Sequence, residues 1–324
     1  MKKLVLLSLL FLVGCSKMEM ASVSKTPDSQ KNIIFHDVSV FDGNTMLRNQ
    51  DVLTNGSTIS SIAPTGTFPV PEEAATIDGI GRTLLPGLID LHVHVFSAGE
   101  KDSQPPDPET ISGALLYAGI TTALITAGPD DANKRAIGSQ NGATVAPHLY
   151  TAGPGLTAPD GHPIPLLRAM LPWPISMFAI RSIITAKDAE EARNQVQRIL
   201  EAFQPEFLKI IYDDLPPGSP HLSSQAMKAA IEAANKSGVR PIVHATTPSD
   251  AVEAAEAGAA LLVHIPQRGI IHDDQIARLL ATNVPVVTTI NLISASHDLA
   301  KRGPTELEKS LVDPKMLSLW QKEP

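Results

Sequence analysis

Four of the ten histidines in this 324-residue chain end short apolar runs, and histidine is a common ligand of divalent metals. His92 and His94 end one such run, and His244 and His264 each end another. Side chains two residues apart on a strand point to one face, so the first two can bind one metal at ~2.0–2.1 Å Zn–N distances. A single pair of this kind also occurs among core or surface histidines. Because a histidine also ends each of two other apolar runs, we predict a divalent-metal site.

Lys209 lies inside another apolar run, residues 207–211. A buried ammonium group without a partner is costly, although a lysine there can also extend to solvent or form an ion pair. The histidines in neighbouring runs favour a functional role for it. Cys15 is the only cysteine, which excludes an intramolecular disulfide and a thiolate zinc site. Any metal ligands must therefore come from His, Asp, Glu or Lys.

These residues need strands that alternate with helices, and the pattern after Pro86 and Gly87 supplies them. Amphipathic stretches at 188–203, 223–237, 248–257 and 273–281 separate several of the strands. The predicted strands are residues 88–94, 121–126, 147–152, 206–212, 241–244, 260–265 and 284–290. No Gly-x-Gly-x-x-Gly motif follows a strand, so the pattern favours a (β/α)8 TIM-type barrel over a doubly wound sheet. The pattern predicts seven strands, so the eighth strand of such a barrel is missing from this prediction.

The combination of these motifs resembles the amidohydrolase superfamily, notably its imidazolonepropionase-like and dipeptidase-like branches. The resemblance runs from about residue 32 to residue 290. It is carried by residues 85–94, by the strand with Lys209, by the strand ends at His244 and His264, and by residues 151–162, which look like the family's loop after the third strand.

The resemblance implies a binuclear metal centre. His92 and His94 would bind the first metal, His244 and His264 the second, and Lys209, carboxylated on its amine, would bridge both. Two divalent ions are implied, with zinc foremost and manganese, iron or cobalt as alternatives.

The reaction implied is hydrolysis of a carbon–nitrogen bond in a small amide, cyclic amide or dipeptide, through a hydroxide that bridges the metals. Catalytic roles would fall on Lys209, His244 and His264. Tyr212, three residues after the lysine, and His162 are candidates for holding the substrate or the developing oxyanion. An ordinary loop role stays open for both.

One family feature is not found, the aspartate at the end of the eighth strand that ligates the first metal and moves the proton. Neither Asp298 nor Asp313 has a suitable place in the sequence. We therefore expect a C-terminally truncated enzyme with impaired catalysis. Two alternatives remain: a non-catalytic envelope lipoprotein that binds a small ligand, and a phosphotriester or lactone hydrolase.

The N-terminus predicts export. Residues 1–15 have two lysines, an apolar run and a final Leu-Val-Gly-Cys that resembles the bacterial lipobox, so Cys15 would be lipidated after cleavage. An ordinary secretory signal is the alternative. Residues 16–31 read as a tether, 32–86 as a small β-sandwich part, and 87–324 as the incomplete barrel. We expect anchoring in the bacterial cell envelope, at the periplasmic face of the outer membrane.

The composition indicates the size of the core and limits the classes of binding partner. With 43% hydrophobic residues the chain can bury a large core. Its net charge of -8 and scattered basic residues argue against a nucleic-acid partner. The oligomeric state stays open, a homo-oligomer included.

Overall fold

The computed structural model describes residues 32–94, 108–128, 133, 137–138, 146–171, 173, 175–181, 183–290, 301–306 and 309. The chain divides into two compact units, Met1–Pro86 and Gly87–Pro324. The predicted signal peptide with Cys15, the tether, Asp298 and Asp313 all lie outside the described residues.

The first unit is built on one mixed sheet of five strands, where we expected a sandwich. The strand order is β3-β2-β1-β4, with β5 paired to β1, and the neighbours of β1 run antiparallel (β2) or parallel (β4 and β5). A small core of Ile34, Val38, Val40 and Val52 lies within the sheet. The strands are β1 (Ile33–Phe41), β2 (Met46–Asn55), β3 (Thr58–Pro64), β4 (Ala75–Asp78) and β5 (Thr83–Leu84).

A buried carboxylate joins the parts of this unit. Asp51 on β2 is 1% exposed and accepts hydrogen bonds from the backbone amides of Asp37 and Gly66, both at 2.9 Å. The Nδ1 atom of His36 lies 2.9 Å from the same carboxylate. Because these donors come from β1 and from the turn after β3, Asp51 holds three segments together.

The second unit contains two parallel sheets whose strands follow one another in chain order, except that β10 lies at the edge of the second sheet, beyond β9. One has the order β6-β7-β8 and the other β10-β9-β11-β12-β13-β14. The strands are β6 (Leu88–Val93), β7 (Ile120–Ile125), β8 (His148–Thr151), β9 (Leu156–Thr157), β10 (Ile184–Thr185), β11 (Phe207–Ile211), β12 (Arg240–His244), β13 (Leu261–Val263) and β14 (Val286–Val287). Each predicted strand coincides with one of these.

The third barrel strand is interrupted. After β8 the chain bends at Gly153, which has a φ of 63°, and resumes as β9 beside β11. The backbone must also approach closely here, since a Cβ on Gly155 would lie 3.0 Å from the Cδ1 atom of Ile211. The break between the two sheets follows from this bend. In the part of the chain that the structure describes, β6 and β14 are not hydrogen-bonded to each other, and no strand lies between them.

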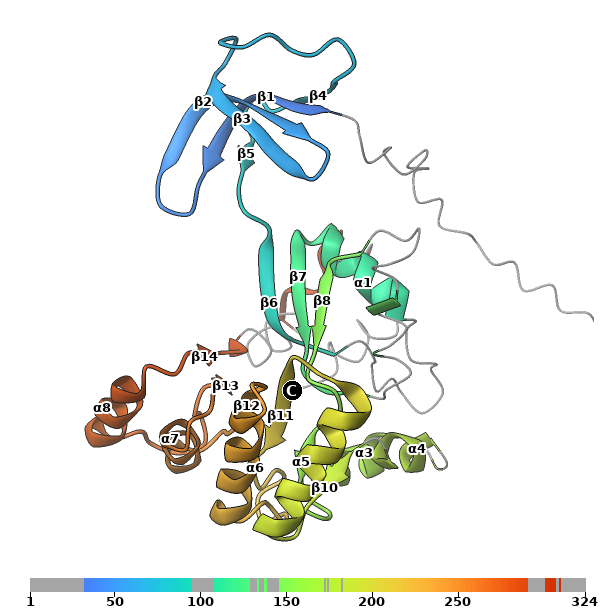
Figure 1. Ribbon diagram of the computed structural model, residues 1–324, viewed down its shortest axis with the longest axis vertical. Helices are drawn as coiled ribbons and strands as arrows, with labels where there is room; N and C mark the ends of the chain where they lie inside the picture. Colours follow the sequence, from blue (N-terminus) through green and yellow to red (C-terminus); the bar gives the residue numbers. More distant parts are fainter. Residues whose placement is uncertain are drawn as a thin grey trace, which may run out of the picture. The chain divides into compact units, whose positions relative to one another are not determined.

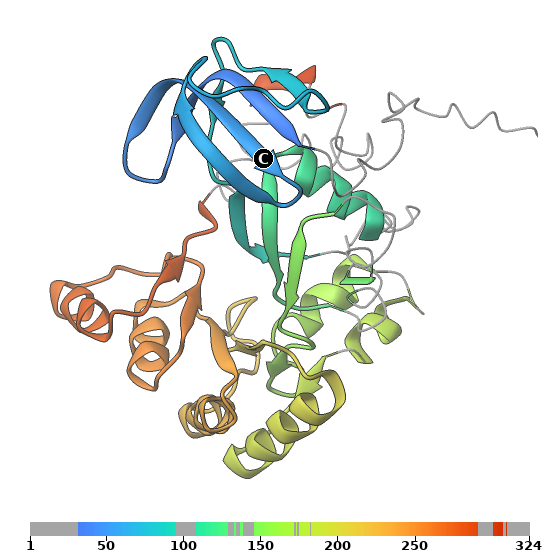
Figure 2. The ribbon, with the colours of Figure 1, turned by 45° about the horizontal axis from the view of Figure 1, so that its top comes forward.

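Helices α5 to α8 lie along the outer side of β11 to β14 (Figures 1 and 2). Three of them begin with a side-chain cap: Asp188, Ser223 and Thr247 each accept a hydrogen bond from a backbone amide three residues later. None of the described helices is both long enough and apolar enough to span a membrane. The helices are α1 (Pro108–Tyr117), α3 (Ile164–Met170), α4 (Ile175–Arg181), α5 (Ala189–Phe203), α6 (Ser224–Lys236), α7 (Pro248–Glu256) and α8 (Asp273–Thr282).

Alternation along the strands separates an outer layer from an interior. Leu208, Ile210, Val243 and Leu262 pack into the same core as residues of α5, α6 and α7. A second cluster joins Leu124 of β7 to strands of the other sheet, so the two sheets curve around a common interior. Its buried members are Leu124, Ala152, Ile242, Leu261 and Val263. The intervening positions Lys209, Ile211 and His244 therefore face inward.

Candidate active site

The inward-facing residues at the carboxyl ends of the strands line a cavity of about 790 Å³. This volume is in the range of small-molecule sites, and the carboxyl end is where barrel enzymes bind their substrates. The cavity brings together both predicted histidine pairs, the lysine and the third-loop histidine: His92, His94, His162, Lys209, His244 and His264.

The first histidine pair has the spacing of two ligands of one metal. The Nε2 atoms of His92 and His94 are 3.3 Å apart. Two nitrogens that each lie ~2.0–2.1 Å from a tetrahedral ion would be separated by about the same distance. The Nδ1 atom of His94 lies 3.1 Å from the carbonyl oxygen of Ala127, which orients that ring. The buried Nδ1 atom of His92 has no hydrogen-bond partner in the part of the chain that the structure describes.

The second pair lies beside the first. The ring centroids of His244 and His264 are 4.4 Å apart, and the ring of His92 is 4.9 Å from that of His264. Since Val263 faces the interior, strict alternation would turn His264 outward. Instead His264 has a φ of 75°, which breaks the alternation and brings its ring to the cavity. A left-handed backbone is unfavourable for a non-glycine residue, and such strain is concentrated at functional sites.

Lys209 lies among these rings with 3% of its surface exposed. No carboxylate pairs with it among the described residues, and burial lowers its pKa to about 7. Burial, together with the charge of Lys209, lowers the pKa of His244 to about 4. Burial and the neighbouring His244 and Lys209 lower the pKa of His264 to about 3. The histidines are therefore neutral at neutral pH, which is the form that binds metals.

The donor set fits a pair of divalent ions only if the lysine takes part. In the described part of the chain, no three His, Cys, Asp or Glu side chains form a metal site by themselves. An ammonium group on Lys209 would repel a cation, whereas a carbamate would offer two anionic oxygens between the histidine pairs. Carboxylated Lys209, which has no carboxylate partner among the described residues, would then be a ligand of both ions.

The two residues predicted to contact the substrate, His162 and Tyr212, lie in different places. His162 lines the cavity, with its ring centroid 5.0 Å from that of His244, and its buried Nδ1 atom has no hydrogen-bond partner among the described residues. Tyr212 does not line the cavity: its hydroxyl donates to Glu253 on α7 at 2.7 Å. Because Tyr212 is an odd number of residues, three, from the inward-facing Lys209, its side chain lies on the outer face of the strand, outside the cavity where we expected it.

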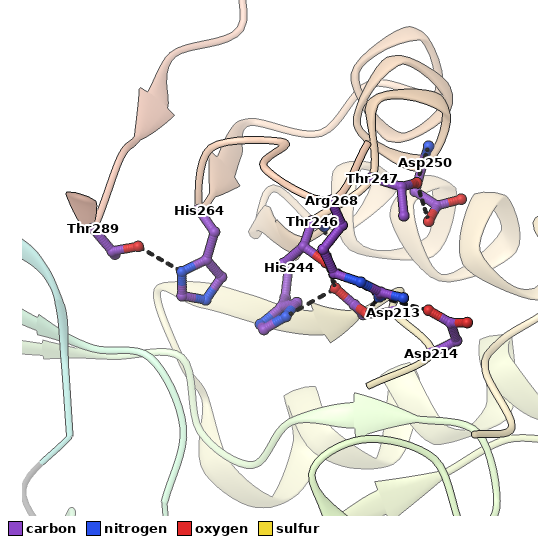
Figure 3. Close-up of polar contacts among 9 residues, drawn as sticks. All are labelled: Asp213, Asp214, His244, Thr246, Thr247, Asp250, His264, Arg268 and Thr289. Atoms are coloured by element: carbon purple, nitrogen blue, oxygen red, sulfur yellow. Dashed lines mark hydrogen bonds and ion pairs between the residues drawn. The ribbon is translucent and has the colours of Figure 1, made fainter. Parts of the chain in front are cut away.

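An acidic residue next to the site, Asp213, was not among the residues predicted from the sequence. It continues the inward-facing series after Lys209 and Ile211, and its side chain is fully buried. The backbone amide of Thr246 donates to its Oδ2 atom at 3.1 Å, and the threonine hydroxyl donates to the same atom. Arg268 donates to its Oδ1 atom at 2.7 Å (Figure 3). The spacing of two residues along β11 was the signal that could have found it.

Asp213 also meets the candidate metal ligands. The Nε2 atom of His244 lies 3.2 Å from its Oδ2 atom, in a contact that is not aligned as a hydrogen bond (Figure 3). Burial alone would raise the pKa of Asp213, but its contacts with His244, Thr246 and Arg268 lower it to about 2. Asp213 is therefore an anion that supports the ring from behind the cavity wall.

Comparison with known families decides the relationship. The model of the Amidohydrolase family matches residues 83–305, which is more than half of the chain and includes all the cavity residues described above. The chain belongs to the Amidohydrolase family. Members of this family generally use divalent metal ions such as zinc. The resemblance noted in the sequence is thus confirmed.

Curated relatives of this amidohydrolase match over short segments. A dihydroorotase of Mycobacterium tuberculosis is 30% identical over 114 residues, which is 35% of this chain and 24% of the relative. Adenine deaminase 2 of Shouchella clausii is 46% identical over 48 residues, which is 15% of this chain and 7% of the relative. The match to the dihydroorotase thus spans about a quarter of that protein.

Solved structures share the fold over most of the chain. A prolidase in complex with N-methylphosphonate-L-proline has a TM-score of 0.67 at 19% identity and covers 90% of this chain and 73% of its own. A Xaa-Pro dipeptidase with bound methionine has a TM-score of 0.64 at 20% identity, covering 90% and 74%. The TIM-type barrel class predicted from the sequence is confirmed by these likenesses.

Proposed function

We propose that this amidohydrolase cleaves a carbon–nitrogen bond in a small amide, cyclic amide or dipeptide. Two divalent ions would be held by His92 and His94 on one side and by His244 and His264 on the other, with carboxylated Lys209 between them. One observation carries the proposal: a fully buried lysine, without a carboxylate partner among the described residues, lies in a cavity among histidines that are kept neutral.

The chain's own groups prepare such a site. Because burial lowers the pKa of Lys209 to about 7, a large fraction of its amine is unprotonated at neutral pH, and only that form reacts with carbon dioxide. Asp213 holds the ring of His244 from outside the cavity. Divalent ions, when bound, supply Lewis acidity toward a carbonyl group and lower the pKa of water. His162 lies where it can contact a polar atom of the substrate.

The names of the relatives support this reaction class. They include a dihydroorotase, an adenine deaminase, a prolidase and a Xaa-Pro dipeptidase, which are enzymes of carbon–nitrogen bonds. At these identities the solved structures show the fold alone, so the bond that is cleaved stays part of our proposal.

A substrate panel tests the proposal. The protein, loaded with zinc or manganese in bicarbonate buffer, is assayed against dipeptides, N-acyl amino acids, cyclic amides, lactones and phosphotriesters. Because no aspartate of an eighth strand was found to move the proton, we expect slow but measurable release of an amine from at least one amide. Cleavage of lactones or phosphotriesters alone would move the protein to another substrate class. Metal binding without any cleavage would instead favour a ligand-binding role.

We further propose that Cys15 anchors the protein in the cell envelope. The proposal rests on the lysines, the apolar run and the lipobox-like end of residues 1–15. Growth with labelled palmitate should label the wild-type protein and not the Cys15→Ser variant. Equal labelling of both would contradict the proposal.

A further inference from the structure

One wall of the cavity is apolar. It is formed by side chains of α3, α4 and the residues that follow α4, together with Leu215 from the loop after β11. Leu166 on α3 belongs to it and is 45% exposed. The described members are Pro163, Leu166, Leu167, Ala179, Ile183 and Leu215. A group of leucines and isoleucines that faces a cavity leaves apolar surface in contact with water until a ligand covers it.

The charged side chains of the described lining lie apart from this wall in the sequence. They are Asp90, on the strand of the first histidine pair, and Lys209. Three arginines come from neighbouring segments, and none of them lines the cavity. Arg168 pairs with Asp160 at 2.8 Å, Arg268 pairs with two aspartates at 2.7 and 2.6 Å, and Arg181 is an exposed residue at the end of α4. Among the described residues that line the cavity, Lys209 is thus the only Lys or Arg, and it lies on β11 among the histidines.

We propose that this wall binds an uncharged apolar group of the substrate, an alkyl or aryl substituent attached to the scissile amide. The inference deepens the proposed function and rests on it, because the amide is placed beside the histidines. A carboxylate in the same position would lose water without gaining a partner. Within the proposed range of substrates, the apolar wall therefore favours neutral amides over dipeptides, which carry charges close to the bond.

The free energy of burying apolar surface predicts how strongly affinity should rise with the length of an alkyl chain. Burial of one methylene group is worth about 0.8 kcal/mol, which corresponds to about fourfold in affinity. A series of probes that differ only in chain length should bind about fourfold more tightly per added methylene until the wall is covered.

Alkyl hydroxamates provide the probe series, because their head group binds metals and their tail reaches the wall. Calorimetry on the zinc-loaded protein compares acetohydroxamate, butanohydroxamate, hexanohydroxamate and octanohydroxamate with succinic monohydroxamate, which ends in a carboxylate. We expect the fourfold slope for the alkyl series, and weaker binding of the carboxylate probe than of butanohydroxamate.

Matched variants on one helix locate the effect. Leu166→Asp places a charge in the wall at an exposed position, whereas Ala169→Asp places the same charge on α3 outside the cavity lining. We expect Leu166→Asp to weaken octanohydroxamate about tenfold or more and acetohydroxamate less than twofold. The Ala169→Asp protein should keep the wild-type slope.

The measurements can contradict the wall proposal and the proposed function independently of each other. If acetohydroxamate binds but affinity does not rise with chain length, or if the carboxylate probe binds as tightly as butanohydroxamate, the wall proposal is overturned. Butanamide, hexanamide and octanamide on the metal-free protein give a second arm. A chain-length dependence there, without hydroxamate binding to zinc-treated protein, would support the wall and contradict the proposed function.

Discussion

Replacement of Lys209 by methionine should stabilise the metal-free protein although it removes a functional group. The ammonium of Lys209 is buried without a carboxylate partner among the described residues, so the folded state disfavours its charged form. Methionine has a similar length and no charge. The stabilisation expected is therefore the free energy that the buried amine costs.

The magnitude follows from the pKa. Burial lowers the pKa of Lys209 from 10.5 to about 7, so at pH 7 the cost is about 4 kcal/mol, at about 1.4 kcal/mol per pKa unit. Between pH 7 and 10.5 the unfolded chain binds more protons than the folded one, so the stability of the wild-type protein rises with pH in this window. The advantage of the Lys209→Met protein should shrink to about 1 kcal/mol at pH 9.5.

Urea denaturation with a chelator, in buffers free of carbon dioxide, measures this difference at pH 7 and pH 9.5. Lys236→Met is the control, since Lys236 is 74% exposed and its replacement should change stability by less than ~0.5 kcal/mol at either pH. A Lys209→Met protein that is less stable than the wild type at pH 7, or a difference that does not depend on pH, would refute the reasoning.

Three further outcomes follow from the structure. Asp213→Asn should lower the free energy of unfolding by about 2–4 kcal/mol, because it weakens a buried ion pair with Arg268. Asp214→Asn should lower it by under ~1 kcal/mol, because the side chain of Asp214 is 33% exposed. Thermal denaturation of both variants checks this difference. Asp51→Asn should destabilise the first unit by about 1–3 kcal/mol at neutral pH. Burial would raise the pKa of Asp51 but two backbone amides lower it overall, so the wild-type advantage should fade as pH drops below about 4, as followed by circular dichroism. Tyr212→Phe should cost about 1–2 kcal/mol through the lost bond to α7 and leave metal content unchanged; a loss of metal would place Tyr212 in the site after all.

Alternation along buried strands made much of this site predictable. The apolar runs in the sequence predicted most strands of the second unit, and the position of Lys209 within one such run predicted that its side chain is buried. The same rule, applied to the residues after Lys209, separates Asp213 from Tyr212: an even spacing keeps the first on the inner face, and an odd spacing sends the second outward.

Other features depend on contacts that a linear pattern does not contain. His264 faces the cavity only because its backbone is left-handed, which the strand pattern does not indicate. Arg268 comes from a loop 55 residues after Asp213 in the chain, and only the folded barrel brings the two together. Strands β9 and β10 are two residues long, too short for any periodicity to appear.

Metal content tests the central claim most directly. The wild-type protein, purified in bicarbonate buffer with zinc and then dialysed, should hold about two ions per chain by elemental analysis. The double variant His92→Ala and His94→Ala should lose about one of them, while His148→Ala, at an exposed position that does not line the cavity, should keep both. An unchanged metal content in the double variant, or no bound metal in the wild type, would contradict the assignment.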